Sequence, residues 1–453
     1  MTLALSTLLY ALFVLLNLAV VAHLLYTRRP TQSLIFWTLI LLLLPFLGPF
    51  LYVLFGSRKL FGRLSKQPLT FDGATAPEDT TPLGRMLARC AMPPARPGNR
   101  AAFTFDPAQA RDWFSEAIEN ARERIWLESY IFATDGTGRR LIRALADKAR
   151  QGVDVRLLID GIGSLPAWLR PGLFRDLREA GGHVAFFQPL SHPLRGAPDL
   201  RNHRKIYLFD NHTLLVGGIN LASEYLDPDA PGHWVDFTCR VSGPVLADHE
   251  ALFRQDWAWA TGERLPATAV PPPIGEALMR LVPTGPDTRE DTVRDALVQA
   301  IVCAREEVLI VTPYFIPDEQ ILQAVLIACK AGVRVRLLTP ERTDNIASRL
   351  GRAHYMRELA EAGAEIGCYT PTMLHAKVFV IDRRFALVGS ANLDYRSMLR
   401  NYELMDIVLD AEFIARLQDE VDRLWRDSVP YAPADSGWAR MGENLFRLFT
   451  PMM

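Results

Sequence analysis

Two long apolar runs open the chain. The first extends from Leu3 to Tyr26 and the second from Leu34 to Phe55, and the short polar bridge 27–30 separates them. Either run is long enough to cross a hydrocarbon core of about 30 Å as a helix. No basic segment precedes the first run, which is also too long for the apolar part of a signal peptide. We therefore expect a transmembrane helical hairpin over residues 1–57, rather than a buried helical pair.

Two further features refine this hairpin. Pro45, Gly48 and Pro49 lie inside the second run, so its helix is expected to be kinked or partly re-entrant. Because cytoplasmic loops carry an excess of Lys and Arg, a weak bias in basic residues places everything after Phe55 on the cytoplasmic side of a multi-pass protein. The residues behind this bias are Arg58, Lys59, Arg63 and Lys66 after the second run, against Arg28 and Arg29 in the bridge.

Beyond residue 100 the chain alternates amphipathic helical patterns with short apolar strands, and this pattern occurs twice. Segment 121–132 returns as 304–315 with the same order of polar and apolar positions, and segment 152–158 returns as 332–338. Alternating helices and buried strands are typical of a sheet whose faces are covered by helices. The sequence therefore predicts two copies of one α/β unit.

Composition along the chain suggests the domain boundaries. Residues 58–100 are rich in Pro, Thr, Gly and Ala and lack periodicity, so a linker is expected there. The first α/β domain is assigned to residues 101–270 and the second to residues 271–430. Residues 431–453 mix Trp, Leu, Phe and Met with two arginines. This amphipathic tail suits an interfacial anchor, and packing of a terminal helix is the alternative.

Overall composition narrows the classes of function. The 453 residues carry a formal net charge of -1, from 50 Lys plus Arg against 51 Asp plus Glu, so no basic coat for nucleic acid is expected. A hydrophobic share of 49% is enough for more than one core. The five cysteines are scattered and show no CxxC spacing, which argues against a disulfide framework and a zinc site. We expect neither a metal nor another cofactor.

The candidate chemistry lies late in each copy, where the spacing HxKx4Dx6GxxN occurs twice. With six lysines and nine histidines in the chain, even HxK alone is expected only about 0.1 times by chance. Coincidence is therefore a poor explanation for two complete motifs. The first contains His203, Lys205, Asp210, Gly217 and Asn220, and the second contains His375, Lys377, Asp382, Gly389 and Asn392.

Strand geometry explains this spacing. Residues two apart on a strand point to the same face, so each His–Lys pair offers a nucleophile and a cation together. The motif Asp has the opposite parity, which favours a supporting role over proton transfer. A glycine turn followed by Asn, with Ser390 in the second copy, brings polar donors to the same point, as an anionic phosphoryl oxygen requires. We expect two such half-sites to act on one phosphodiester across a pseudo-twofold axis.

These paired motifs resemble those of the phospholipase D superfamily, and nearly the whole chain is similar to the bacterial cardiolipin synthases of the two-motif membrane type. The similarity includes the N-terminal hairpin, the strand end Thr312–Phe315 and the tail segment Leu445–Pro451. It implies an α/β fold of two tandem phospholipase D-like α-β-α domains, related by a pseudo-twofold axis and preceded by a transmembrane hairpin. It also implies one shared site, no metal, and a location in the bacterial inner (cytoplasmic) membrane.

The resemblance further implies roles for single residues. Transfer of a phosphatidyl group passes through a covalent phosphohistidine, with His203 as the usual nucleophile and His375 as the general acid. An acidic residue downstream of each motif holds the histidine, although a solvated or structural carboxylate is the alternative. One departure is Gly218, where a hydroxyl residue is usual. The expected catalytic residues are His203, Lys205, Asp210, His375, Lys377 and Asp382, and the expected substrate-binding residues are Asn220, Ser390, Asn392, Asp236 and Glu403.

Two classes of function fit these motifs. The first is a membrane phosphatidyltransferase that joins two phosphatidylglycerols into cardiolipin and glycerol, with phosphatidylethanolamine as an alternative co-substrate. The second is a phospholipase D-type hydrolase or a nuclease that uses the same site. The hairpin, the hydrophobic tail and the near-zero charge favour the first class, because a nuclease need not lie in a bilayer and usually has a basic face. Phospholipid and membrane are the expected partners and nucleic acid is not, while the sequence leaves the oligomeric state open.

Overall fold

The computed structural model describes most of the chain and divides it into two compact units. One consists of residues 1–66 with 190–200, and the other of residues 67–189 with 201–453. The first unit contains both apolar runs, and the second contains both copies of the repeat. The described residues are 2–26, 31–56, 68–71, 81–189, 199–433 and 436–447.

One long apolar helix dominates the first unit. Helix α1 (Thr2–Tyr26) has 25 residues, and its part from Thr7 to Tyr26 has a mean hydropathy of 2.4 and is only 11% buried. Among the described residues it is the only helix long and apolar enough to cross a membrane. The next helix, α2 (Thr31–Leu43), has 13 residues, which is about 20 Å at the usual helical rise. The predicted N-terminal apolar helix is therefore present, whereas helix α2 of the second run is shorter than a bilayer core.

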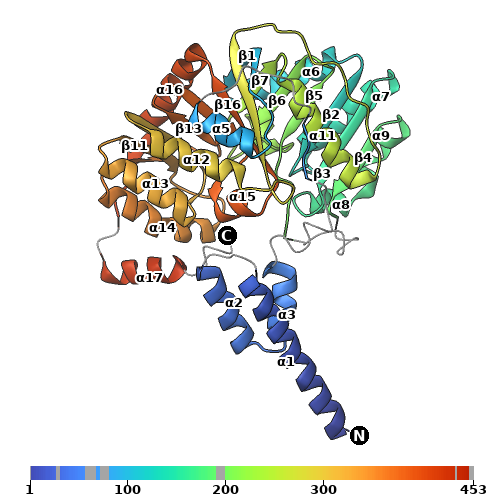
Figure 1. The fold of residues 1–453 in the computed structure, drawn as a ribbon. Coiled ribbons are helices and arrows are strands. Elements are labelled where there is room, and N and C mark those ends of the chain that lie inside the picture. The colour runs from blue at the N-terminus through green and yellow to red at the C-terminus, as the bar shows by residue number, and fades with distance from the viewer. Residues whose placement is uncertain are drawn as a thin grey trace. The chain divides into compact units, whose positions relative to one another are not determined.

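The second apolar run is broken where its prolines and glycine stand. Helix α2 ends at Leu43, and a turn containing Pro45 follows. The chain then continues as α3 (Gly48–Leu51) and the π-helical turn η1 (Tyr52–Gly56), which lie along one half of α1 (Figure 1). Proline cannot donate to an α-helical ladder and clashes with the preceding turn, so the interruption is expected here. The interruption predicted for this run, as a kink or a partly re-entrant segment, is therefore present.

The second unit contains two similar series of helices and strands after α5 (Pro82–Arg89) and β1 (Arg96–Thr104). The first series is α6 (Pro107–Asn120), β2 (Arg124–Ser129), α7 (Gly136–Arg150), β3 (Asp154–Asp160), α8 (Leu165–Trp168), η2 (Pro171–Phe174), α9 (Arg175–Glu179), β4 (His183–Phe187), β5 (Ile206–Phe209), β6 (Thr213–Gly217), α10 (Ser223–Leu226), β7 (Thr238–Ser242) and α11 (Leu246–Thr261). The second series is β8 (Ala277–Thr284), α12 (Thr292–Cys303), β9 (Glu307–Val311), β10 (Phe315–Ile316), α13 (Glu319–Lys330), β11 (Arg334–Pro340), α14 (Ile346–Glu361), β12 (Glu365–Tyr369), β13 (Val378–Ile381), β14 (Phe385–Gly389), β15 (Leu393–Asp394), α15 (Tyr395–Leu399), β16 (Glu403–Leu409), α16 (Ala411–Arg426) and β17 (Ser428–Pro430).

One mixed sheet of fifteen strands joins the two series (Figure 1). Its order is β17-β12-β11-β9-β13-β14-β16-β8-β1-β7-β6-β5-β2-β3-β4. Apart from the edge strand β17, the order is the same from either end when each strand is exchanged for its counterpart in the other series. The predicted pair of tandem α/β repeats is therefore present, with their pseudo-twofold relation centred between β1 and β8.

Each repeat has a hydrophobic core of its own beneath its helices. Strands β2 and β9 are buried along their whole length, and they contain the apolar residues 125–127 and 308–311. Leu127, Leu157 and Tyr207 belong to the core of the first repeat, and Ile310 and Phe379 to that of the second. The strands that carry the motifs are therefore fixed by packing on both sides.

Two segments are more structured than the sequence predicted. Helix α5 and the start of β1 lie within residues 58–100, the range expected to be a linker, and Leu87 is buried in the core of the second repeat. The tail forms helix α17 (Gly437–Arg447), which an ion pair of 2.8 Å between Arg357 and Glu443 joins to α14. A few packed side chains order these short helices, which weak periodicity in the sequence does not reveal.

Candidate active site

The two HxK motifs immediately precede equivalent strands, β5 and β13, and each is hydrogen-bonded to the other repeat. The backbone N–H of His203 donates to the Tyr402 carbonyl at 2.9 Å, and that of His375 donates to the Val235 carbonyl at 2.7 Å. The Val235 carbonyl precedes β7 and the Tyr402 carbonyl precedes β16, and these two strands are equivalent in the two repeats. The pairing brings the two predicted half-sites together across the pseudo-twofold axis.

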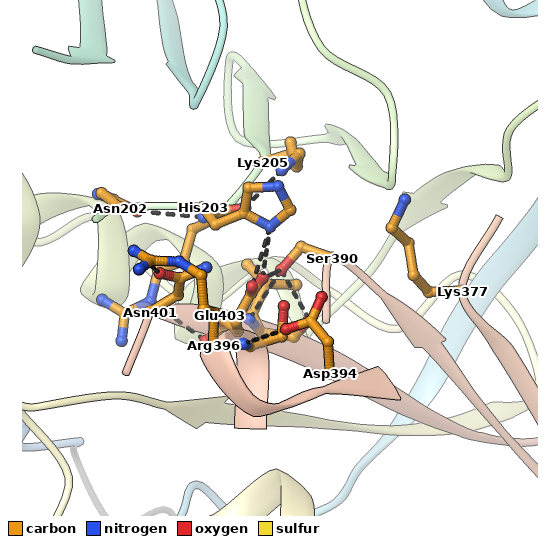
Figure 2. A network of polar contacts seen from close by, with 12 residues as sticks. Asn202, His203, Lys205, Lys377, Ser390, Asp394, Arg396, Asn401 and Glu403 are labelled. Carbon is orange, nitrogen blue, oxygen red and sulfur yellow. Dashed lines mark hydrogen bonds and ion pairs between the residues drawn. The ribbon is translucent and has the colours of Figure 1, made fainter. Parts of the chain in front are cut away.

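Carboxylates are exchanged between the repeats in the same way. His203 Nδ1 lies 2.9 Å from the carboxylate of Glu403 (Figure 2). His375 Nδ1 lies 2.7 Å from Asp236 Oδ2. A carboxylate accepts the Nδ1 proton and so leaves Nε2 of each ring as the nitrogen for chemistry. The sequence pointed to both carboxylates, but the exchange was not foreseen, because nothing in either motif indicates which histidine an acid downstream will reach.

The two carboxylates are held differently, and this explains the departure at Gly218. Ser390 Oγ donates to Glu403 Oε2 at 2.6 Å and accepts from the Leu404 N–H at 3.0 Å. A Cβ at Gly218, the equivalent position, would lie 2.2 Å from Asp236 Oδ1. The longer Glu403 side chain is thus held by a hydrogen bond from Ser390, whereas the shorter Asp236 occupies the space that a side chain at position 218 would fill. Ser390, expected to contact substrate, instead uses its hydroxyl proton on Glu403.

Both motif lysines are fully buried beside the histidines. Lys205 Nζ donates to the His203 carbonyl at 2.7 Å, and Lys377 Nζ lies 2.6 Å from His375 Nδ1 and 3.1 Å from its Nε2. Burial lowers the pKa of Lys205 to about 7, with Glu403 opposing and Lys377 assisting the fall. Burial likewise lowers the pKa of Lys377 to about 8, against the charges of Asp236 and Glu403. These mutual effects indicate one shared electrostatic site.

The histidines respond to the same field. Burial lowers the pKa of His203 despite the nearby Glu403 carboxylate. Burial and the Lys377 ammonium lower the pKa of His375 to about 3, and Asp236 opposes them. Both rings are therefore neutral at pH 7 in the unliganded site. An anion between the repeats favours the charged forms of the histidines and lysines alike, so binding of a phosphodiester is coupled to proton uptake.

The motif asparagines differ in their hydrogen bonding. Asn220 Oδ1 accepts from the backbone N–H of Ile131 at 3.1 Å, which fixes its amide. The side chain of Asn392 is buried, and its Oδ1 has no hydrogen-bond partner among the described residues. A buried amide oxygen without a partner is costly. Asn392 is therefore the better placed of the two to contact a ligand.

The motif aspartates lie at the opposite end of the motif strands from the histidines. The Asp210 carboxylate accepts from three consecutive backbone N–H groups, those of residues 122–124, at 2.7–2.9 Å. Asp382 accepts in the same way from residues 305–307 at 2.8–3.0 Å. Both expected catalytic aspartates thus hold the turn before β2 or β9, in agreement with their strand parity and not with a chemical step.

One residue that the sequence did not single out links the repeats beneath the site. Arg204, between the motif His and Lys, is fully buried and donates to Asp256 at 2.8 Å and to Asp287 at 3.1 Å. Its Nε lies 3.3 Å from the Glu403 carbonyl. Asp287 and Glu403 belong to the second repeat, so Arg204 joins the two repeats next to His203. The only sequence signal was an arginine at a position otherwise expected to be apolar.

Aromatic rings surround both histidines. The Tyr130 ring lies 4.9 Å from that of His203, and Trp234 and Tyr225 lie 4.9 Å and 5.5 Å from that of His375, between ring centroids. Tyr130 and Trp234 are half-buried. The contact with the His203 ring places Tyr130 at the site.

The described residues contain no group of three or more His, Cys, Asp or Glu side chains that could hold a metal ion. The donors gathered at the site are imidazole and ammonium nitrogens with two engaged carboxylates. This set is suited to an anionic phosphoryl group rather than to a cation.

Comparisons with known proteins agree with this geometry. The family model described as "Cardiolipin synthase, PLD-like domain" matches residues 114–257 and 297–425, and the model "Phospholipase_D-nuclease N-terminal" matches residues 15–57. The major cardiolipin synthase ClsA of Bacillus subtilis is 32% identical over 99% of this chain and 100% of its own length. Cardiolipin synthase A of Pseudomonas fluorescens is 32% identical over 98% of both chains.

A solved structure supports the fold independently. The phosphatidylserine synthase of Haemophilus influenzae matches 78% of this chain and 95% of its own with a TM-score of 0.58, at 15% identity. The duplicated sheet and the paired His–Lys site define a two-repeat enzyme of the phospholipase D superfamily. Within that superfamily the chain belongs to the cardiolipin synthase family, and it is a membrane-associated transferase of phospholipid biosynthesis.

Proposed function

We propose that the enzyme makes cardiolipin and glycerol from two molecules of phosphatidylglycerol through a phosphatidyl-histidine intermediate. The observation that carries this proposal is the exchanged pair of His–carboxylate contacts, 2.9 Å at His203 and 2.7 Å at His375. Each contact fixes the Nδ1 tautomer, so two Nε2 atoms become available to one phosphodiester. Relatives named as cardiolipin synthases supply the direction of the chemistry.

In the first step His203 Nε2 attacks phosphorus of one phosphatidylglycerol. A nitrogen–phosphorus bond forms and the bond from phosphorus to the headgroup glycerol oxygen breaks. His375, protonated in the complex because the bound anion raises its pKa, gives its proton to the departing glycerol. Lys205, Lys377 and Asn392 stabilise the charge on the phosphoryl oxygens.

In the second step the headgroup hydroxyl of another phosphatidylglycerol takes the place of the departed glycerol. His375, now neutral, accepts the hydroxyl proton as the oxygen attacks phosphorus, and the bond to His203 breaks. One phosphodiester has been exchanged for another, so no nucleotide is consumed. The reaction is near-balanced and is drawn forward as glycerol leaves.

The deciding experiment incubates purified enzyme with headgroup-labelled phosphatidylglycerol in mixed micelles and identifies every product. We expect cardiolipin and labelled glycerol in equal amounts. Phosphatidic acid as the sole lipid product would instead identify a hydrolase. Cardiolipin formed only when phosphatidylethanolamine is added would identify that lipid as the co-substrate, and cleavage of a nucleic acid under the same conditions would identify a nuclease.

The proposed substrates place the enzyme in the bacterial cytoplasmic membrane, with both repeats on the cytoplasmic side. Support comes from the apolar α1 and from basic residues that follow the second apolar run. Helix α17 adds a second candidate membrane contact, because its Trp438 is 80% exposed and its Met441 58% exposed. Membrane sedimentation before and after removal of residues 437–453 tests the contribution of this tail.

A further inference from the structure

The contacts between α1 and the second apolar run show how far along α1 this run extends before it turns. Helix α2 starts near the end of α1, since a bridge of only four residues separates them. At the far end of α2, Asn17 Nδ2 donates to the Pro45 carbonyl at 2.8 Å, and the rings of Phe13 and Phe46 meet edge to face at 4.9 Å. The part of α1 between Phe13 and Tyr26 rises about 20 Å. Measured from the end of α1, the run therefore turns at a depth of about two thirds of the thickness of a hydrocarbon core, which is ~30 Å.

After the turn the chain returns along the same helix. The Tyr52 hydroxyl lies 2.6 Å from His23 Nδ1. Between their contact points, α1 advances about 9 Å from Asn17 to His23, and the return segment advances about 10 Å from Pro45 to Tyr52. The two advances agree in size and direction, so this segment runs parallel to α1 and ends beside Tyr26.

Close packing against α2 fixes the position of the segment that returns along α1. A Cβ at Gly48 would lie 3.1 Å from Leu41 Cα, so glycine permits the close approach of α3 to α2. The Tyr52 ring is buried and meets the Trp37 ring at 5.1 Å. The outer surface of the turn is apolar and exposed, with Phe46 at 58% and Leu47 at 48%. Hydrocarbon is the surrounding that such a surface fits.

We infer that α1 is the only membrane span within the described part of the chain and that residues 31–56 form a re-entrant hairpin, which enters and leaves the bilayer on the side where α1 ends. The exposed apolar surface of this hairpin contacts one leaflet and the core of a lipid bilayer. Gly56 and Tyr26 lie on the same side, so the chain leading to the repeats departs from the side of the bridge 27–30. The N-terminus lies on the opposite side.

The distribution of charge supports this topology. In a two-span hairpin the two basic residues of the bridge would face the opposite side from the four that follow the second run. In the re-entrant topology all six lie on one side, and the opposite side contains no basic side chain. The bias in Lys and Arg that orients membrane proteins thus becomes six to none instead of four to two. It places the bridge and both repeats in the cytoplasm and the N-terminus outside.

Three cysteine reporters distinguish the topologies. Cys303 is exposed at the end of α12 and reports the side of the repeats without any substitution. Thr2→Cys reports the N-terminus, and Tyr26→Cys reports the bridge, since Tyr26 is 88% exposed. Each variant is treated with a membrane-impermeant maleimide in intact spheroplasts and in inside-out vesicles, and the labelled peptides are identified by mass spectrometry. Lipid synthesis in the same vesicles controls for correct folding, because none of the three positions lies at the active site.

The re-entrant topology predicts that Tyr26→Cys and Cys303 are labelled from the same side and Thr2→Cys from the other. Labelling of Thr2→Cys together with Cys303, and of Tyr26→Cys from the opposite side, would establish a two-span hairpin and overturn the inference. Labelling of all three from one side would show that α1 does not span and would overturn it equally. The result does not depend on which phospholipids react, so it is separate from the test of the proposed function.

Discussion

The two histidines stand on identical motifs but in different surroundings. Behind His203 lies a network of charges, in which Glu403 holds the ring and the buried Arg204 pairs with Asp256 at 2.8 Å and Asp287 at 3.1 Å. This network crosses from one repeat to the other and fixes the position of the first motif.

Around His375 the surroundings are aromatic. The rings of Trp234 and Tyr225 lie 4.9 Å and 5.5 Å from its own, and Ala376 stands where Arg204 stands in the first motif. The duplicated motif therefore preserves the reacting groups, while their supports have diverged. A rigid ionic network behind the ring suits the histidine that forms a bond to phosphorus. Aromatic neighbours around a ring that Asp236 holds suit the histidine that must exchange protons as the substrate charge changes.

Loss of either reacting histidine is the largest expected effect. His203→Ala and His375→Ala each lower the rate of cardiolipin formation by about 10⁴–10⁶-fold, and the double variant is little worse, because nucleophile and acid act as one unit. His183→Ala, an exposed histidine at the start of β4, serves as the matched control and retains activity. Near-normal activity of either site variant would rule out a shared site.

The exchanged carboxylates rank second. Glu403→Gln and Asp236→Asn each lower the rate by about 10²–10⁴-fold, because an amide neither fixes the same tautomer nor stabilises the charged ring. A lipid with a p-nitrophenyl leaving group, which needs no proton, separates them in single-turnover kinetics. Release of nitrophenol recovers in Asp236→Asn and stays slow in Glu403→Gln. Equal behaviour of the two variants would remove the proposed division of roles, and Asp229→Asn on the surface is the control.

The stability of an Arg204 variant tests whether the buried charge network distinguishes the His203 site from the His375 site. Arg204→Met leaves Asp256 and Asp287 buried without their cation, which costs about 3–5 kcal/mol in the free energy of unfolding. We expect the midpoint temperature of thermal unfolding of the solubilised enzyme to fall by about 4–6 °C. Arg140→Met removes an arginine whose side chain is 60% exposed and changes stability by at most about 1 kcal/mol. Similar effects of both substitutions would mean that the buried network does not fix the first motif.

The smallest expected effect is on the pH profile. The pKa of Lys205 is lowered to about 7 and that of Lys377 to about 8, so both lose protons in the free enzyme as pH rises from 7 to 9. Capture of the anionic substrate then weakens, and kcat/KM falls by about tenfold or more, because this constant reports groups of the free enzyme. Lysines of ordinary pKa would keep kcat/KM constant to about pH 10. A flat profile to that pH would contradict the shared burial of the lysines.

Sequence predicted the reacting groups and the duplicated fold because both depend on short-range patterns. Each motif places His and Lys two residues apart, and the apolar residues 125–127 and 308–311 indicate the buried strands β2 and β9. The exchange of Asp236 and Glu403 between repeats depends instead on how two distant segments meet, which spacing within one repeat does not encode. The same holds for Arg204, whose partners lie 52 and 83 residues away.

In the membrane segment, the sequence located the apolar runs but did not determine their topology. Hydropathy identified both apolar runs, and Pro45 with Gly48 indicated an interruption. Hydropathy alone does not distinguish a kinked span from a chain that turns back, because both bury the same residues in hydrocarbon. The contacts of Asn17 and His23 with the return segment make that distinction.

The most direct test of the central claim is to trap the intermediate on the wild-type enzyme. A rapid quench during turnover of phosphatidylglycerol, followed by proteolysis at neutral pH and mass spectrometry, locates the phosphatidyl group. We predict a single adduct on His203, absent from His203→Ala and still formed by His375→Ala from the p-nitrophenyl substrate. An adduct on His375 would reverse the roles of the two repeats, and no adduct on either histidine in an enzyme that is turning over would contradict the covalent mechanism.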